Sequence, residues 1–431
     1  MKYYNIICQK FFHLLILTIL SCGFVFFNRV NDSLFFEKYD YFLNPSSDKN
    51  IFLSSAVKNN LFFNQASFFN NNFSLKTDVL LRLSRVQNCS WYKKEIAATP
   101  IFTVDRVFVF GKDGILKCFN RNDGNVIWQY QIVESVKKNK EFYSLSFQKG
   151  LILVAAECKV FIFNKDGKEV FYQELTSPAV SCGVLDDNSY LHLQTMYEYI
   201  KYDIKLGISS LKVPCVVGDI NHRHNFSPIL YNGGVLYKKG YDAFEYIPIN
   251  KTDSRISFIT QGFLSQIGLS ELQDFPFSSL GNVSCQPILF RDHLFVAFAN
   301  KVIVKIDLFF NKIVWSKIVP CVNQISQVGN TLFATTFSGR AIALDIDTSD
   351  IIWKINLGYK LSSSFLPPVI VNDNIFLFSK REKEIIKLSA KEGKILNRLR
   401  VKGIKRCDIL SLFPIEDSLF LFTNRKIIQF K

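Results

Sequence analysis

The 431-residue sequence is poor in residues that interrupt regular structure, with only 12 Pro and 20 Gly. These low counts exclude a long flexible linker of the Gly-rich or Pro-rich kind. The sequence also lacks a phosphate-cradling Gly-rich loop and a Ser/His/Asp motif in a recognisable context. No motif therefore indicates an enzyme class, and we predict no enzyme activity, no cofactor and no resident metal.

The ten Cys residues form neither a Cys-x-x-Cys motif nor an adjacent Cys-Cys pair. Disulfides are open to an exported chain with an even number of Cys. Most of these residues, however, lie inside apolar, strand-like runs, as Cys118, Cys158 and Cys182 do. Buried free thiols are the simpler interpretation of that pattern.

The sequence does contain an excess of positive charge and a large apolar fraction. Its formal net charge is +15, from 52 basic and 37 acidic residues, and 48% of its residues are hydrophobic, with 43 Phe. The Lys residues are scattered, and no Arg/aromatic motif of an RNA-binding type accompanies them. We therefore predict no nucleic-acid partner, and the apolar residues suffice for a large core.

The N-terminus has the features of a bacterial export signal. Two Lys residues precede an apolar run that ends in Leu20-Ser21-Cys22, which resembles a lipobox with Cys22 as the lipid-attachment residue. Residues 11–27 also form 17 apolar-leaning positions, the lower limit for a membrane-spanning helix. Residues 1–22 are thus predicted to be a signal peptide with a lipobox or a membrane anchor.

Residues 23–85 show no clear periodicity, and we expect them to form a poorly ordered stalk. Beyond them, short alternating runs are separated by turn residues, and no helix-period segment of useful length occurs. The runs recur as a unit of four in about 34–36 residues. Three units end in related phrases, which are FNRNDGNVIWQYQI (119–132), IDLFFNKIVWSKIV (306–319) and IDTSDIIWKINL (346–357).

Seven complete units fit between residues 99 and 401. Residues 408–431 supply three strands of an eighth unit, and its missing fourth strand matches NCSWYKKEI at residues 88–96. An N-terminal strand that completes the last C-terminal sheet is how a propeller ring closes. The sequence therefore predicts an all-β, eight-bladed β-propeller over residues 86–431, with the last blade closed by an N-terminal strand.

A large aromatic residue recurs at one position of the fourth, outermost run. Because each sheet has two apolar faces and stacks radially, this side chain can dock into the neighbouring blade. Losing such a buried Trp should cost about 3–5 kcal/mol. The predicted docking residues are Trp91, Trp128, Phe171, Phe258, Trp315 and Trp353, with Leu211 at the same place in a weaker copy.

The Asp-x-x-x-Gly-x-x-x-Trp type of phrase in an eight-bladed ring resembles the PQQ-like propeller repeat. Together with Cys22, it makes the chain similar to the BamB family, the propeller lipoproteins of the outer-membrane β-barrel assembly machinery. The resemblance implies a non-enzymatic scaffold that binds the barrel-inserting subunit and helps to deliver unfolded outer-membrane proteins. It implies a place at the periplasmic face of the bacterial outer membrane, with an inner-membrane anchor as the alternative, and we expect a monomer within a complex.

In that family the partner contacts lie in the loops that precede the first strand of two successive blades, as a Leu-x-Leu-Arg and an Asp-x-Asp element. The matching positions here, counted back from the Pro residue of each blade, are Ile220, Arg223, Asn282 and Ser284. Only the Arg matches outright, because His222 replaces the second Leu and neutral residues replace both acids.

Three other interpretations stay open. A membrane-anchored propeller of the same repeat type could serve another envelope partner, for example in peptidoglycan maintenance. A quinoprotein dehydrogenase shares this fold, but its cofactor site requires an adjacent Cys-Cys disulfide, Ca²⁺ ligands and a catalytic Asp, and no Cys-Cys pair exists here. Cys215, His222 and His224 lie close in sequence, but no fourth zinc ligand at suitable spacing is evident.

Overall fold

The chain forms an all-β structure, as predicted. Every regular element in the part that the computed structural model describes is a β-strand. This part comprises residues 57–58, 72–74, 83–88, 95–134, 143–215, 227–239, 243–248, 256–259, 283–298, 302–319, 321–359, 363–404, 407–415 and 418–430.

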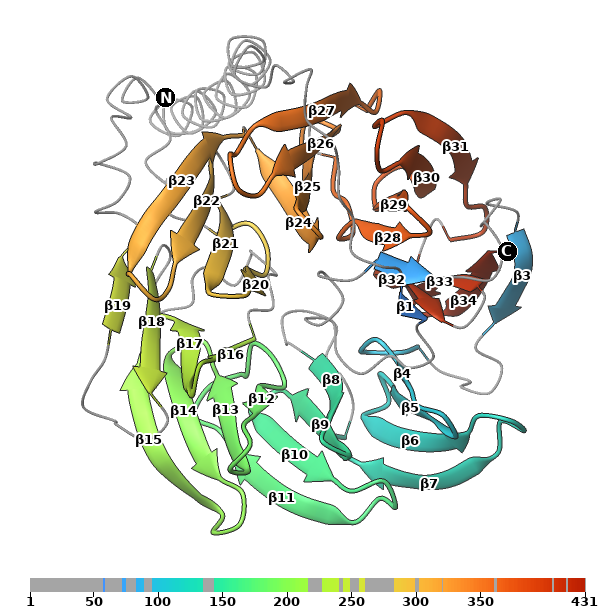
Figure 1. The fold of residues 1–431 in the computed structure, drawn as a ribbon. Helices are drawn as coiled ribbons and strands as arrows, with labels where there is room; N and C mark the ends of the chain where they lie inside the picture. Colours follow the sequence, from blue (N-terminus) through green and yellow to red (C-terminus); the bar gives the residue numbers. More distant parts are fainter. Residues whose placement is uncertain are drawn as a thin grey trace, which may run out of the picture. The chain divides into compact units, whose positions relative to one another are not determined.

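The strands form eight sheets, which Figure 1 shows as blades arranged around a ring. Blade 1 contains β4 (Ile101–Phe102), β5 (Arg106–Phe110), β6 (Ile115–Asn120) and β7 (Val126–Gln131). Blade 2 contains β8 (Tyr143–Gln148), β9 (Leu151–Ala156), β10 (Lys159–Phe163) and β11 (Glu169–Glu174). Blade 3 contains β12 (Val184–Leu185), β13 (Tyr190–Gln194), β14 (Glu198–Asp203) and β15 (Ile208–Pro214). Blade 4 contains β16 (Ile229–Tyr231), β17 (Gly234–Lys238), β18 (Ala243–Pro248) and β19 (Ile256–Ile259).

The second half of the chain continues the same plan. Blade 5 contains β20 (Ile288–Phe290), β21 (His293–Phe298), β22 (Val302–Asp307) and β23 (Lys312–Ile318). Blade 6 contains β24 (Val322–Val328), β25 (Thr331–Thr336), β26 (Arg340–Asp345) and β27 (Ile351–Asn356). Blade 7 contains β28 (Val369–Val371), β29 (Asn374–Ser379), β30 (Glu384–Ser389) and β31 (Ile395–Arg400). Blade 8 contains β32 (Ile409–Ile415), β33 (Ser418–Thr423), β34 (Lys426–Phe430) and β3 (Leu83–Asn88).

Within each of blades 1 to 7, the first strand lies toward the centre of the ring and the fourth lies at its rim (Figure 1). Because these four strands are antiparallel neighbours, the first–second and third–fourth turns share one face of the ring. We call this the turn face. The second–third turns and the connections between blades share the opposite face, which we call the loop face.

The hydrophobic core is divided among the spaces between blades. One cluster joins Phe171 and Leu153 of blade 2 to Leu191 and Tyr202 of blade 3, and comparable clusters join most other successive blades. The second strand of each blade is buried on both faces for this reason; all six residues of β25, for example, are buried. A single sheet of this kind could not bury its faces alone.

The ring closes as predicted, but with a different strand. β3 pairs antiparallel with β34 at the end of the chain. The assignment of residues 88–96 to this place is therefore wrong, and the pairing begins at Leu83, ahead of the predicted propeller boundary at residue 86. At the end of this stretch, Ile96 bridges Gly111 of blade 1, and its N–H donates to Asn424 O of blade 8 at 2.8 Å.

Two short strands occur in the segment that was predicted to be a poorly ordered stalk. β1 (Val57–Lys58) and β2 (Asn72–Ser74) run parallel to each other, and β2 runs parallel to β28. The sheet of blade 7 therefore has six strands. The stalk prediction does not hold for the residues of these two strands, nor for residues 83–85 at the start of β3.

Removing β3 should weaken the whole ring, because β34 would become an unpaired edge and blade 8 would lose its outermost strand. We expect a chain that begins at residue 89 to melt at least about 5 °C below one that begins at residue 81. Thermal unfolding followed by circular dichroism measures this. Equal melting temperatures for the two chains would show that β3 does not close the ring.

Candidate interaction surface

The recurring phrase of the sequence is a turn followed by a bulged rim strand. In blade 6, Asp345 Oδ1 accepts the N–H groups of Asp347 and Thr348, both at 2.9 Å, which is an Asx turn. Ser349 follows with a φ of 64°, and the register then shifts so that Ala343 pairs with Trp353. The same shift of register occurs between the third and fourth strands of every blade except blade 4. This bulge determines the direction of the side chain that follows it.

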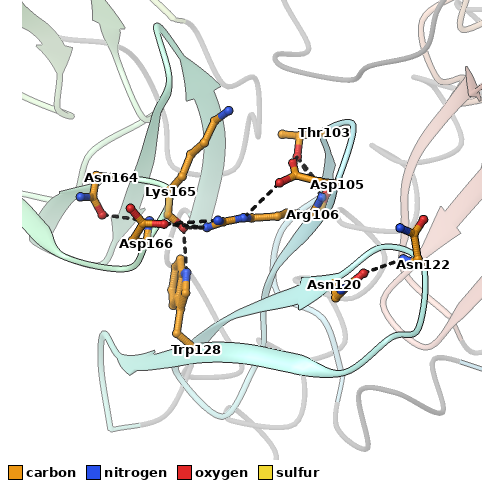
Figure 2. A network of polar contacts seen from close by, with 9 residues as sticks. All are labelled: Thr103, Asp105, Arg106, Asn120, Asn122, Trp128, Asn164, Lys165 and Asp166. Atoms are coloured by element: carbon orange, nitrogen blue, oxygen red, sulfur yellow. Dashed lines mark hydrogen bonds and ion pairs between the residues drawn. The ribbon is translucent and has the colours of Figure 1, made fainter.

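Trp128 occupies that position in blade 1 and reaches the turn of blade 2. Its Nε1–H donates to Lys165 O at 2.9 Å (Figure 2). Arg106 donates to the same carbonyl and forms an ion pair with Asp166 at 3.2 Å. A Cβ at Gly167 would lie 2.6 Å from the indole, so only glycine allows this turn to pack against the ring.

The junction between blades 5 and 6 repeats this arrangement with different residues. Trp315 Nε1–H donates to Ile346 O at 2.8 Å. The buried Lys305 donates to the same carbonyl at 3.0 Å and pairs with Asp347 at 3.2 Å. A cation and an indole from one blade thus share one backbone carbonyl of the next. The sequence gives no sign of Arg106 or Lys305 in this role, because both lie outside the repeated phrase and come from different strands of their blades.

Trp353 makes the third junction of this type, between blades 6 and 7. It is 7% exposed, and its Nε1–H donates to Ala390 O at 2.8 Å. A Cβ at Gly393 would lie 2.5 Å from its ring. Here the residue after the accepting carbonyl is Lys391, a cation at the position that Asp166 and Asp347 occupy in the other two turns.

The other predicted docking positions differ in what the structure describes. Phe171 is 4% exposed, with its ring centroid 5.6 Å from that of Tyr202 in blade 3. Leu211 has the equivalent register position in blade 3. Phe258 pairs with Phe244 without a bulge, and its side chain lies outside the described residues. Trp91 also lies outside them, and the register places Arg85, not Trp91, at the equivalent position of β3.

The predicted partner contacts fall mostly on undescribed segments. Ile220, Arg223 and Asn282 lie outside the described residues. Ser284 is 1% exposed, and both its N–H and its hydroxyl donate to Ala297 O, at 2.8 and 3.1 Å. The assignment of Ser284 to a partner contact does not fit this burial, because its polar groups are used within blade 5.

A side-chain amide joins the ends of these two connections on the loop face. Gln286 Oε1 accepts the N–H of Ser227 at 3.0 Å, and its Nε2–H donates to Ser227 O at 3.2 Å. Ser227 directly follows residues 216–226, and Gln286 lies four residues beyond residue 282. The exits of the two connections are therefore held side by side. Sequence reasoning missed Gln286, since its partner is 59 residues away.

A buried polar chain runs between blades 3 and 4. His192 Nε2 lies 3.1 Å from Asp186 Oδ2, and His192 Nδ1 lies 2.6 Å from the Tyr199 hydroxyl. Tyr199 stacks on Tyr237 at 4.4 Å, and Tyr237 donates to Glu245. These five residues are at most 2% exposed. Residues of these types could relay protons, but here they are buried between two blades and stabilise the junction.

The Cys residues among the described residues form no disulfides. These are Cys118, Cys158, Cys182, Cys215, Cys285, Cys321 and Cys407, as predicted for them. Burial raises the pKa of Cys215 to about 11, which makes it a poor metal ligand at neutral pH. The two His residues considered with it lie outside the described residues. Among the described residues no group of three potential metal ligands occurs, and no helix could span a membrane.

A family model places this propeller among known proteins. The model described as outer membrane protein assembly factor BamB matches residues 112–355, which is more than half of the chain. The chain belongs to the BamB family. The match runs from blade 1 to the rim strand of blade 6, so it includes Trp128, Trp315 and Trp353 and the accepting carbonyls of the first two.

Solved structures share the fold of this BamB family member. BamB from Moraxella catarrhalis has a TM-score of 0.60 and 12% identity, covering 81% of this chain and 97% of that one. A computationally designed protein, Ika8, has a TM-score of 0.56 and 10% identity, covering 82% and 100%. These likenesses concern the fold.

Two curated relatives come from Rickettsia, and both are uncharacterized proteins. The one from Rickettsia prowazekii is 19% identical over 291 residues, covering 65% of this chain and 69% of its own. The one from Rickettsia conorii is 21% identical over 361 residues, covering 79% and 84%. Neither name supplies an activity.

Trp353→Ala should lower the free energy of unfolding by about 3–5 kcal/mol, because it removes a buried indole between blades 6 and 7. Trp353→Phe should cost less but still about 1 kcal/mol beyond its lost area, since Ala390 O loses its donor. Melting temperature measures both. The control is Leu396→Ala, which changes a residue 49% exposed on β31. An effect of Leu396→Ala as large as that of Trp353→Ala would contradict the docking role.

Acid should destabilise the junction of blades 3 and 4 through His192. Burial lowers the pKa of His192 below its ordinary value of 6.5, and this outweighs the opposing effect of Asp186; Lys201 also lowers it. Protonation therefore favours the unfolded chain, so stability falls as the pH drops below about 6.5 and levels off beneath the folded pKa. His192→Gln should flatten the melting temperature between pH 7.5 and 5.5. The comparison variant is His293→Gln, where burial also lowers the pKa but at a less buried position, so its effect on the slope should be smaller. An unchanged slope in His192→Gln would refute the assignment.

Proposed function

We propose that this propeller is a non-enzymatic scaffold of the outer-membrane β-barrel assembly machinery. It binds the barrel-inserting subunit through its loop face and helps to deliver unfolded outer-membrane proteins. The observation that carries the proposal is the match of more than half of the chain to the BamB family model. The eight-bladed ring with its N-terminal closing strand fits the same role.

The geometry of the loop face supports a contact made by two successive blades. Gln286 fixes the exits of the connections before β16 and β20 next to each other through two hydrogen bonds to Ser227. A partner that contacts both connections would therefore meet a fixed spacing at their bases, which lowers the entropy lost on binding. Arg223, on the first connection, is the residue that matches the family element outright. We propose it as the main polar contact.

The chain is proposed to act at the periplasmic face of the outer membrane. Its sequence supports a tether at the N-terminus, either a lipid on Cys22 or an uncleaved apolar segment over residues 11–27. The tether keeps the ring near the membrane in both cases. The proposal needs only that proximity.

A second candidate is a membrane-anchored propeller for another envelope partner. It is favoured by the departures from the family contact elements, since Ser284 is buried and both acids are neutral residues here. The two candidates share the fold and the tether, and they differ in what the loop face binds.

Affinity capture from crosslinked membranes distinguishes them. The full chain should recover the barrel-inserting subunit, and Arg223→Ala should lower that recovery at least about tenfold, as loss of a charged interface contact does. Lys149→Ala is the matched control, because Lys149 is an exposed cation on the turn face, paired with Asp187 at 2.5 Å. Recovery of a different envelope protein in place of the subunit would refute the first proposal and support the second.

A further inference from the structure

Several turns of the turn face carry exposed apolar side chains. Among the described residues, the large apolar side chains at turns that stay mostly exposed are Val104 (72%), Tyr197 (57%), Leu206 (68%), Phe309 (73%) and Phe310 (65%). Tyr197 lies on the loop face, between the second and third strands of blade 3. The other four lie on the turn face of blades 1, 3 and 5.

The Phe309–Phe310 pair is held rigidly at the tip of its turn. Asp307 Oδ1 accepts the N–H groups of both residues at 2.9 Å, and Asn311 follows with a φ of 49°. The two rings meet edge to face at 4.9 Å. Lys312 Nζ lies 5.0 Å from the Phe310 ring centroid. Two aromatic rings with a cation beside them are thus presented outward on a fixed turn.

Comparison with the other blades shows that the fold does not require these rings. The same two turn positions hold Asp347 and Thr348 in blade 6 and polar pairs in blades 1 and 7, namely Asn122-Asp123 and Lys391-Glu392. All three turns keep the hydrogen bond to the first residue of the turn. The conformation of the turn therefore does not explain why two aromatic residues occupy these positions.

We propose that the turn face rests on a lipid bilayer, with Phe309 and Phe310 inserted into its interface. The apolar tips are convex and are spread over blades 1, 3 and 5, so one protein pocket could not receive them all, whereas a planar surface meets them together. Aromatic rings with Lys beside them are also the chemistry that the interface accepts, because the rings enter the acyl boundary while the ammonium stays at the headgroups.

The charge beside two of the tips fits anionic headgroups. Exposed lysines adjoin these tips, Lys205 beside Leu206 and Lys312 two residues after Phe310, although exposed carboxylates such as Asp187 also lie on this face. Each such lysine near an anionic leaflet contributes about 1 kcal/mol of attraction. The contact leaves the loop face free, and it does not depend on which protein that face binds.

Tryptophan substitution with lipid quenching tests the contact on the full chain. Phe310→Trp and Tyr197→Trp place a new indole on the turn face and on the loop face, respectively. Each variant is reconstituted into vesicles that contain anionic lipid and lipids brominated on the acyl chains. We expect Phe310→Trp emission to be quenched well beyond the parent chain, with Tyr197→Trp no more quenched than the parent. Replacing half-exposed side chains should leave both melting temperatures unchanged, which verifies folding.

The possible outcomes separate the bilayer from other occupants. No added quenching of Phe310→Trp, or equal quenching of both variants, overturns the proposal. A blue shift of Phe310→Trp emission in native membranes, without quenching in brominated vesicles, assigns the tip to a protein and overturns it as well. If Phe310→Trp alters the melting temperature, Phe309→Trp takes its place, with the same expected result.

Discussion

The hydrogen bond from an indole N–H on a rim strand to a turn carbonyl of the next blade fixes how the blades stand against each other. Apolar burial between sheets is large but non-directional, so it would allow blades to slide. Trp128, Trp315 and Trp353 remove that freedom by reaching one defined carbonyl each, at 2.8–2.9 Å. A single bond of this type contributes only about 1 kcal/mol net. Its value lies in specifying the angle between blades at the rim, where a small rotation moves atoms furthest.

The bulge that aims these indoles also protects the rim. Each fourth strand is the edge of its sheet among the described residues and would offer free backbone groups to another chain. A bulge twists the strand and breaks the regular row of donors and acceptors. The residue that the shifted register skips is often apolar and exposed, as Ile127, Val170 and Leu396 are, at 45–49%. Without the bulge, such residues would form part of a flat, apolar edge strand that could pair with another chain. Docking and protection thus follow from one local feature.

The sequence allowed the blades and their number to be predicted, because each unit repeats its pattern within about 35 residues. It misled at the closing strand. Trp91 made residues 88–96 resemble the repeated phrase, but the register of β3 is set by β34, at the other end of the chain, and places Arg85 at the docking position. The cation at two junctions could not be foreseen either. Arg106 and Lys305 come from the second and third strands of their blades, and Gln286 meets Ser227 across 59 residues, so no local pattern marks any of them.

Because the hydrogen bonds that orient the blades lie at the rim, the connections on both faces can vary without loss of the fold. In blade 5, Phe309 and Phe310 occupy the turn positions that Asp347 and Thr348 occupy in blade 6. Blade 5 nevertheless keeps both a capping Asp and a docking Trp, which is Trp315. On the loop face, Gln286 stabilises the bases of two connections and leaves their chemistry open. The proposed scaffold, with one face for a protein and the other for a membrane, would benefit from this separation, since a change on either face leaves the blade junctions intact. The contacts at the rim therefore stabilise the fold. The residues that differ between blades on the two faces are the candidates for function.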